Sequence, residues 1–307
     1  MVMTSKFQQI PVPAYPGERE PGKESLVKVA ALQMEPHIGN KDRNIEETLK
    51  IIDEAGKQGA ELMVLPELCN TGYIFNSRQE AFALSEEVPE GPTTEEWIKA
   101  AQKHNAYICA GITEREGNHL YNSVVVVGPE GYIGTYRKTH LWNEEKLWFE
   151  PGNLGYPVFS LPFGKIGCRV CYDVWFPEVT RILAAQGADI ICDSTNWVVV
   201  DPLQTKEKPT AATSAAQMSL MNAVYSICAD RVGEERGCVY IGNSCITDPG
   251  GGFVAGPGDP DKPEVVMAEI NVMLARYRHW SDFNNPHTDR RTDLYDEFLG
   301  YYPDEEW

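Results

Sequence analysis

VKVAALQM, at residues 27–34, opens the part of the sequence that decides the fold, and NIEETLKIIDEAGKQGA (44–60) and ELMVLPEL (61–68) complete it. The first and third stretches are nearly all apolar, as expected for strands of a sheet that helices cover. The middle stretch carries apolar residues at helical spacing on one face, namely Ile45, Leu49, Ile52 and Ala55. The three stretches therefore predict a strand, an amphipathic helix and a second strand.

The same alternation continues along the chain. It predicts helices over residues 93–105, 176–187 and 210–225, and strands over 106–113, 188–195, 226–232, 238–252 and 264–272. Residues 122–138 and 157–173 each predict a hairpin, because two apolar runs flank a turn that contains glycine. Helix-separated strands mixed with hairpins indicate a layered α/β domain with mixed sheets. About ten strands are too many for one open sheet, so two stacked sheets are expected.

The ends of the chain differ in composition from its middle. Residues 1–25 are rich in proline, glycine and charge, which predicts a flexible N-terminal arm on the surface. No internal repeat or linker divides the following residues, so a single domain is expected over 26–275. The last stretch, 276–307, is a polar and aromatic tail.

Charge and cysteine usage exclude several classes of protein. The chain has 307 residues and a net charge of −18, and no Lys/Arg cluster offsets that charge, so neither a nucleic acid nor a membrane surface is an expected partner. The first residues carry no apolar signal-peptide core of roughly 7–15 residues, and no apolar run of about 18 residues occurs. The 8 cysteines lie mostly in apolar runs, as free thiols do. We therefore expect a reduced, cytoplasmic protein.

Motifs for cofactors and metals are absent from the sequence. There is no GxGxxG, no Walker loop and no GxSxG elbow. Cys168 and Cys171 have CxxC spacing, but a zinc or redox site needs a second pair or a suitable strand-to-helix context. No second pair exists, and the histidines are scattered. No cofactor and no metal site are therefore predicted.

Two candidate catalytic residues follow apolar strands. Glu67 comes after a run of four apolar residues and a proline, so its carboxylate should be desolvated, with a raised pKa that suits a general base. Lys138 ends a predicted strand and enters a loop rich in Trp and Glu. In that loop Glu144 and Glu145 are adjacent, so only one of them should face a site.

A third candidate, Cys171, lies between a strand and a predicted helix that opens with Phe176-Pro177-Glu178. Proline and glutamate are typical of the first turn of a helix. Backbone N–H groups and the positive helix end at such a junction should lower the pKa of the thiol and make it nucleophilic. The sequence thus predicts Cys171 as a nucleophile, with Glu67 and Lys138 as its partners.

Taken together, the three segments resemble the nitrilase superfamily of carbon–nitrogen hydrolases. PELCNTGY (66–73) is similar to its base motif, YRKTHLW (136–142) to its lysine motif and CYDVWFPE (171–178) to its nucleophile motif, in the same order. Further landmarks are YNS (121–123), FEPG (149–152), STNW (194–197) and DRVG (230–233), where the family usually has Asn-Arg-Val-Gly. The resemblance covers residues 27–272. It implies a four-layer αββα sandwich of two mixed sheets, and a homodimer or larger assembly with the tail at the subunit interface.

The resemblance also implies roles for individual residues. Cys171 would be the nucleophile, Glu67 the proton carrier, and Lys138 with the backbone N–H of Tyr172 the donors to the oxyanion. The pattern EKxxF…PG assigns the family's second glutamate to Glu145, with Glu144 as the alternative. The residues that would line the substrate pocket are Tyr73, Trp142, Trp175, Asn196 and Trp197.

The substrate branch follows from the residues after the nucleophile. In aromatic nitrilases the nucleophile segment resembles Cys-Trp-Glu, whereas this chain has Cys-Tyr-Asp at the same place. N-carbamoyl-D-amino acid hydrolases carry an arginine that binds the α-carboxylate, and Val174 and Trp175 stand there instead. CYDVWFPE more closely resembles the aliphatic amidase and N-carbamoyl-polyamine hydrolase branches of the family. That resemblance favours a primary carboxamide as substrate, ahead of an N-carbamoyl amine and then a nitrile. An inactive binding or scaffold protein is disfavoured, because Glu67, Lys138 and Cys171 are all present.

Overall fold

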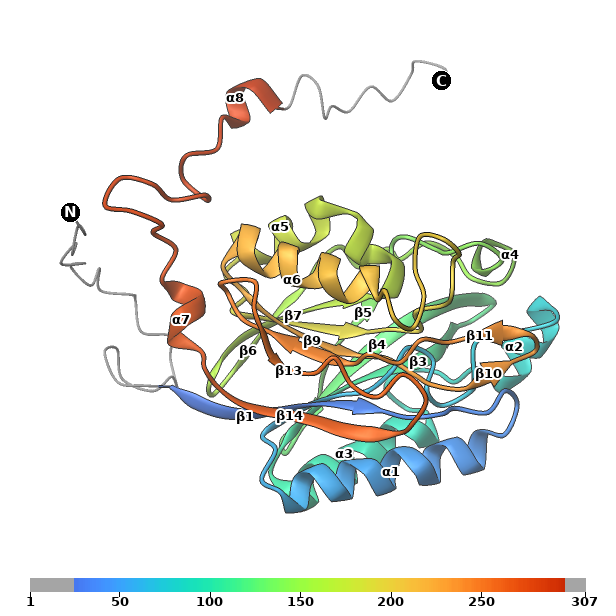
Figure 1. The fold of residues 1–307 in the computed structure, drawn as a ribbon. Coiled ribbons are helices and arrows are strands. Elements are labelled where there is room, and N and C mark those ends of the chain that lie inside the picture. Colours follow the sequence, from blue (N-terminus) through green and yellow to red (C-terminus); the bar gives the residue numbers. More distant parts are fainter. Residues whose placement is uncertain (1–24, 296–307) are drawn as a thin grey trace.

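The computed structural model describes residues 25–295 and shows four layers, with two sheets stacked between two pairs of helices (Figure 1). Each of the two large sheets has six strands. Helices α1 (Lys41–Lys57) and α3 (Pro92–His104) cover one side of the stack, and α5 (Pro177–Ala185) and α6 (Thr210–Asn222) cover the other. The predicted αββα sandwich is confirmed. The predicted arm at 1–25 lies outside the described residues except for Ser25.

The first sheet has the strand order β14-β1-β2-β3-β4-β5. Its strands are β1 (Leu26–Gln33), β2 (Leu62–Val64), β3 (Tyr107–Glu116), β4 (His119–Gly128), β5 (Gly131–Arg137) and β14 (Glu264–Asn271). Strands β1, β2 and β3 are parallel, while β3-β4, β4-β5 and β1-β14 are antiparallel pairs. Helices join the parallel strands and short turns join the hairpin, so the mixed sheet follows from the sequence pattern.

The second sheet has the strand order β13-β12-β9-β8-β7-β6. Its strands are β6 (Val158–Leu161), β7 (Gly164–Val170), β8 (Ile190–Ser194), β9 (Tyr225–Ala229), β12 (Cys245–Thr247) and β13 (Phe253–Ala255). Strands β7, β8 and β9 are parallel, and the outer pairs are antiparallel. The carboxyl ends of these three parallel strands therefore face the same edge, where side chains converge in layered α/β folds.

Two buried layers explain why β1 reads as one apolar run. Val29 and Ala31 pack between the sheets, in one cluster with Ile227 of β9 and its neighbours. Ala30 and Leu32, which point to the opposite face, pack with the apolar face of α1 and α3. From Val29 to Gln33 both faces of the strand are thus buried and no polar alternation remains, whereas Leu26 and Lys28 are exposed.

Several short elements complete the described fold. They are α2 (Arg78–Leu84), α4 (Glu145–Trp148), a 3₁₀ turn η1 (Cys171–Trp175), the ribbon strands β10 (Glu234–Glu235) and β11 (Cys238–Val239), α7 (Met273–Arg276) and α8 (Thr292–Tyr295). None of these short helices was predicted from the sequence, because a stretch of four to seven residues is too short to show a helical period.

Some predicted boundaries were wrong. The second strand ends at Val64 rather than at residue 68, since Pro66 has no N–H to continue a ladder and Leu68 takes a left-handed φ of 47°. The predicted strand at 238–252 is two short strands in different sheets. Helix α3 covers Pro92–His104, one residue earlier at each end than the predicted range of 93–105.

After α7 the C-terminal segment passes α5 and the end of α6, where Arg181 donates to the carbonyl of Pro286 and the His287 ring hydrogen-bonds with the carbonyl of Asn222, and it continues to α8 (Figure 1). It exposes large apolar side chains, among them Trp280 and Phe283, whose exposed fractions are 59% and 93%. Residues 296–307 of the predicted tail lie outside the described residues. Among the helices of residues 25–295, none has the length and apolar character that crossing a membrane requires.

Candidate active site

Three charged side chains meet where strands of the first sheet end. Lys138, which follows β5, donates from Nζ to Oε1 of Glu67 at 2.6 Å and to Oε2 of Glu145 at 2.8 Å. Glu67 lies in the turn after β2, and Glu145 opens α4. All three side chains are buried. Glu144, the neighbour of Glu145, is exposed, so of the two candidate glutamates Glu145 is the one that contacts the lysine.

Asn122 on β4 joins the two carboxylates. Its side-chain N–H donates to Oε1 of Glu67 at 2.7 Å and to Oε1 of Glu145 at 2.8 Å. The backbone N–H of Trp142 donates to the other oxygen of Glu145 at 2.7 Å. Within residues 25–295, Oε2 of Glu67 makes no hydrogen bond. Glu145 is therefore saturated by donors, whereas Glu67 keeps one oxygen free to accept a proton.

The electrostatics of this cluster follow from its burial. Burial raises the pKa of Glu67 to about 8, and the charge of Glu145 adds to the rise while Lys138 opposes it. The predicted desolvation of Glu67 is confirmed. Burial also disfavours the charge of Lys138, but the carboxylates of Glu145 and Glu67 outweigh it and raise the pKa of the lysine. The lysine therefore stays an ammonium, and Glu67 can exchange a proton near neutral pH.

Cys171 opens the turn η1 at the end of β7, with a left-handed φ of 46°. Such a backbone conformation in a non-glycine residue costs about 1–3 kcal/mol and is typical of functional sites. The helix α5 begins only at Pro177, six residues later in the chain, rather than at Phe176 as predicted. Cys171 thus opens the separate 3₁₀ turn η1 and does not lie at the N-terminus of α5.

The predicted low pKa of the Cys171 thiol was wrong. Burial raises its pKa well above the ordinary value, and the negative charge of Glu67 raises it further. The positive charge of Lys138 and the backbone N–H of Asn196 lower it, but they do not compensate. The thiol is therefore protonated at rest, and its reactivity requires a base that removes the proton during attack.

Asp173 connects the turn that contains Cys171 with the loop that contains Lys138 through hydrogen bonds. Its carboxylate accepts the backbone N–H of Val170 at 2.9 Å and the hydroxyl of Tyr136 at 2.7 Å. It also accepts the backbone N–H of His140 at 3.2 Å. Its donors come from both sides of the site, so the carboxylate fixes the nucleophile turn relative to the lysine loop.

A second connection runs through the segment after β8. Asn196 donates from its side chain to the backbone carbonyl of Glu67 at 2.9 Å, and its backbone N–H contacts the sulfur of Cys171. Buried Asp230 fixes this segment by accepting the backbone N–H of Trp197 at 2.7 Å and the hydroxyl of Thr195 at 3.0 Å. Asn196 therefore touches both the base and the thiol.

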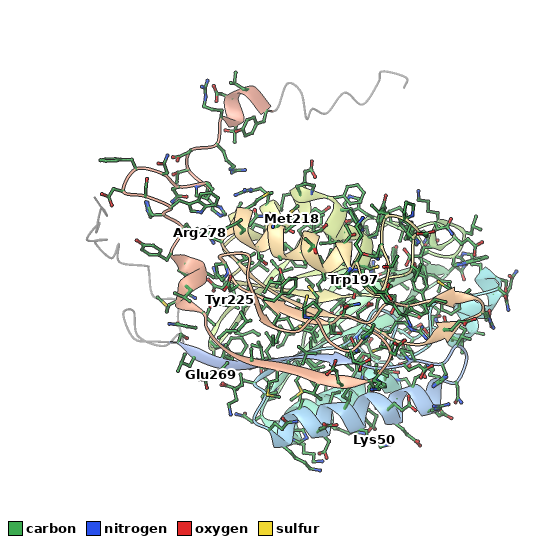
Figure 2. The ribbon with its side chains drawn as sticks, in the orientation of Figure 1. Lys50, Trp197, Met218, Tyr225, Glu269 and Arg278 are labelled. Atoms are coloured by element: carbon green, nitrogen blue, oxygen red, sulfur yellow. The ribbon has the colours of Figure 1, made fainter. Side chains whose placement is uncertain are left out.

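A pocket of about 260 Å³ opens beside Cys171. Its walls are Trp142, Cys171, Tyr172, Trp175, Asn196, Trp197, Val198, Val200, Leu203 and Gln204. Trp197, labelled in Figure 2, lies beneath helix α6. The volume lies just below the roughly 300–1,000 Å³ range of ligand pockets, which suits a small ligand, and the lining is mostly aromatic and aliphatic.

Most of the predicted pocket residues line this cavity, but Tyr73 does not. Tyr73 lines a smaller neighbouring pocket of about 70 Å³ together with Glu144, Glu145 and Trp142. Sequence reasoning missed Val200 and Leu203, since nothing in their local pattern marks a cavity. It also gave no site role to Asn122, although YNS was noted as a landmark of the resemblance.

The CxxC pair does not act as a unit in the fold. Cys168 points between the sheets and hydrogen-bonds with Cys109 of the first sheet, while Cys171 lines the pocket. Both are free thiols. In the described part of the chain, no group of three or more His, Cys, Asp or Glu is arranged to hold a metal ion.

The arrangement suits covalent catalysis by a thiol. A nucleophile, a carboxylate with one free oxygen and a fixed ammonium share one buried site next to an apolar pocket. The backbone N–H of Tyr172 belongs to the peptide bond that follows the nucleophile. Such groups can remove a thiol proton and stabilise an oxyanion without a metal or cofactor.

Comparisons with known proteins agree with this chemistry. A family model described as carbon–nitrogen hydrolase matches residues 28–279. The chain is similar to a nitrilase of Pyrococcus abyssi, with 45% identity over 270 residues that cover 88% of this chain and 99% of that protein. It is similar to an N-carbamoylputrescine amidase of Solanum lycopersicum, with 30% identity over 90% of this chain and 96% of that protein. The crystal structure of an amidase from Nesterenkonia sp. has the same fold, with a TM-score of 0.73, 22% identity and coverage of 89% and 96%.

Proposed function

Because the chain belongs to the carbon–nitrogen hydrolase family, we propose that it hydrolyses a small primary carboxamide to a carboxylic acid and ammonia, with Cys171 as the nucleophile. The observation that carries the proposal is the pocket beside Cys171. Among the described residues, its lining includes no charged side chain, which suits a neutral acyl group.

In the first half of the proposed reaction, the sulfur of Cys171 attacks the carbonyl carbon of the amide while Glu67 takes the thiol proton. The ammonium of Lys138 and the backbone N–H of Tyr172 stabilise the oxyanion, and each such donor is worth about 3–4 kcal/mol. The C–N bond then breaks, Glu67 returns the proton to the leaving nitrogen, and ammonia departs. A thioester on Cys171 remains.

In the second half, a water molecule attacks the thioester carbon while Glu67 takes a proton from it. The same donors stabilise the second oxyanion. As the C–S bond breaks, Glu67 returns the proton to the sulfur, which restores the Cys171 thiol and releases the acid. Glu67 thus serves as base and acid in turn, a role supported by its free oxygen and its pKa of about 8. Glu145 positions Lys138 and the water, supported by its two contacts with the ammonium.

Nitrile hydrolysis is the second candidate, favoured by the 45% identity with the Pyrococcus abyssi nitrilase. A nitrile R–C≡N would present the same R group to the pocket and the same carbon to the sulfur. An N-carbamoyl amine with a cationic tail ranks lower. None of the described residues that line the Cys171 pocket is a carboxylate that could pair with the cation.

An ammonia-release assay tests the proposal, with propionamide, benzamide, propionitrile, benzonitrile and N-carbamoylputrescine as substrates. We expect the highest kcat/KM on an amide, and no release from any substrate with Cys171→Ala. Turnover restricted to the nitriles would replace the proposal with the second candidate. Turnover restricted to N-carbamoylputrescine, or near-normal turnover by Cys171→Ala, would refute it.

We further propose that the protein is cytoplasmic and forms a homodimer or a larger assembly, with the tail from residue 276 at the subunit interface. The exposed Trp280 and Phe283 on the C-terminal segment support an interface role. Sedimentation of the full chain and of the double variant Trp280→Ser/Phe283→Ser tests it. We expect a shift to smaller species in the variant, and an unchanged monomer in both would contradict the proposal.

A further inference from the structure

We propose that residues 198–204, here the 198–204 loop, determine the size of the acyl group that the enzyme accepts, through the side chains of Val200 and Leu203. The proposal rests on the proposed function. The three tryptophans of the pocket wall lie outside this loop, whereas Val200 and Leu203 are aliphatic residues within it, on the surface. The loop is therefore where pocket size can vary without disturbing Cys171.

The loop is fixed to the sandwich where it begins. Val198 forms an isolated antiparallel bridge with Tyr240, and the backbone N–H of Val199 donates to the carbonyl of Val239 at 3.0 Å. Tyr240 is fully buried, so this attachment is to the interior of the fold. The start of the loop therefore cannot move away from the pocket without breaking ordered backbone hydrogen bonds.

The loop is also closed on itself. The backbone groups of Val200 and Gln204 exchange two hydrogen bonds, at 2.9 and 2.8 Å. The Gln204 side chain, with an exposed fraction of 4%, donates to the carbonyl of Val198 at 2.9 Å and accepts the backbone N–H of Ala211 at 2.7 Å. Both the nitrogen and the oxygen of the Gln204 amide thus form hydrogen bonds inside the protein. Gln204 is therefore a positioning residue that holds the loop against the start of α6.

Leu203 differs from the other walls of the pocket. Its exposed fraction is 49%, although its side chain lines the cavity. Its backbone carbonyl accepts the hydroxyl of Thr210 at 2.6 Å, so the exposed side chain stands on a fixed backbone. An apolar group that enters the pocket would cover this surface and gain the free energy of its removal from water. A fixed aliphatic surface at the entrance thus favours an apolar acyl chain and limits its length.

Two homologous series test this inference, the primary amides from acetamide to hexanamide and the nitriles with the same R groups. The measured quantity is the ratio of kcat/KM for the longest and the shortest member. One methylene in an apolar pocket changes kcat/KM by about 10–200-fold, so Leu203→Ala should raise the ratio at least about tenfold. Leu203→Phe should lower the ratio. Val200→Ala should also raise the ratio. Gln204→Ala, which releases the loop, should bring the ratio closer to one.

Val199→Ala is the matched control. Val199 is in the same loop and is half-exposed, but its side chain does not line the pocket, so the ratio should remain that of the wild type. Equal ratios in wild type, Leu203→Ala and Leu203→Phe would refute the inference, as would an equal effect of Val199→Ala. A change in oligomeric state without a change in the ratio would assign Leu203 to an interface instead. If no amide is hydrolysed, the proposed function fails, while the nitrile series still tests the loop.

Discussion

The pH dependence of turnover gives a sharp prediction for Glu67. The proposed reaction needs this carboxyl group deprotonated, so kcat/KM should rise with pH through its pKa. Burial places that pKa at about 8, far above the ordinary glutamate value of 4.5. At pH 6, about 1% of a base with this pKa is deprotonated, so kcat/KM should be about 100-fold below its plateau.

The variant Glu145→Gln should shift the acid limb of the pH profile, where kcat/KM rises with pH, in a known direction. The negative charge of Glu145 raises the pKa of Glu67, whereas Lys138 lowers it. Without the Glu145 charge, the ammonium acts on Glu67 alone, so the pKa of Glu67 falls and the acid limb moves to lower pH. Glu144→Gln is the matched control, because Glu144 is the adjacent residue and is exposed.

The assay is ammonia release at limiting substrate from pH 5 to pH 10, fitted separately for each protein so that a lower plateau does not mimic a shift. We expect a wild-type limb near pH 8, a limb at lower pH for Glu145→Gln, and no shift for Glu144→Gln. A wild-type limb between about pH 4 and pH 5, where unperturbed glutamates titrate, would refute the reasoning. Equal shifts in both variants would refute it as well.

Three further predictions concern groups that hold the site together. Lys138→Met leaves Glu67 and Glu145 buried without their cation, so turnover should be lost and the free energy of unfolding should fall by about 3–5 kcal/mol. In the folded variant these buried carboxyl groups can bind protons at a pH at which the unfolded chain leaves them ionised. Urea titrations should therefore show that the loss of unfolding free energy relative to wild type becomes smaller as pH falls towards 6. A loss that does not change with pH would contradict this. Asp173→Ala removes the acceptor for Val170, Tyr136 and His140, and each buried donor left unpaired costs about 1–3 kcal/mol. Thermal unfolding should therefore show a lower Tm and kcat should fall, and a wild-type kcat would contradict the role of Asp173 in fixing the two loops. Asp230→Asn keeps an oxygen for the N–H of Trp197 and the hydroxyl of Thr195, whereas Asp230→Ala does not. KM and kcat should stay near wild type in the first and worsen by about tenfold in the second, and equal losses in both would show that the charge of Asp230 matters rather than its hydrogen bonds.

Much of the fold could be predicted from periodicity. The helical spacing of Ile52 and Ala55 marks α1, and both residues pack on the first sheet as expected. The two-sheet stack follows from the number of strands and from the hairpins. The ends of the strands were harder to predict from the sequence. Leu65 is as apolar as the strand before it, and only the chain geometry at Pro66 ends the ladder.

The candidate site was predictable as a set of residues and not as an electrostatic system. Glu67, Lys138 and Cys171 stand out because polar groups follow apolar strands. Burial raises the pKa of Cys171, and the charge of Glu67, more than a hundred positions away in the chain, raises it further. Asn122 and Leu203 reach the site by tertiary contacts that no local pattern encodes.

The account depends most on a covalent thioester at Cys171, and mass spectrometry of the acid-quenched enzyme measures it directly. Enzyme at steady state with its best amide is quenched, digested and mapped for acylated cysteines. We predict one acyl group on the peptide that contains Cys171 and none on the peptide of Cys238, which is the most exposed free cysteine of the described residues. The acyl group should be absent from Cys171→Ala. Turnover without any acylated cysteine, or with acylation at another cysteine, would contradict the account.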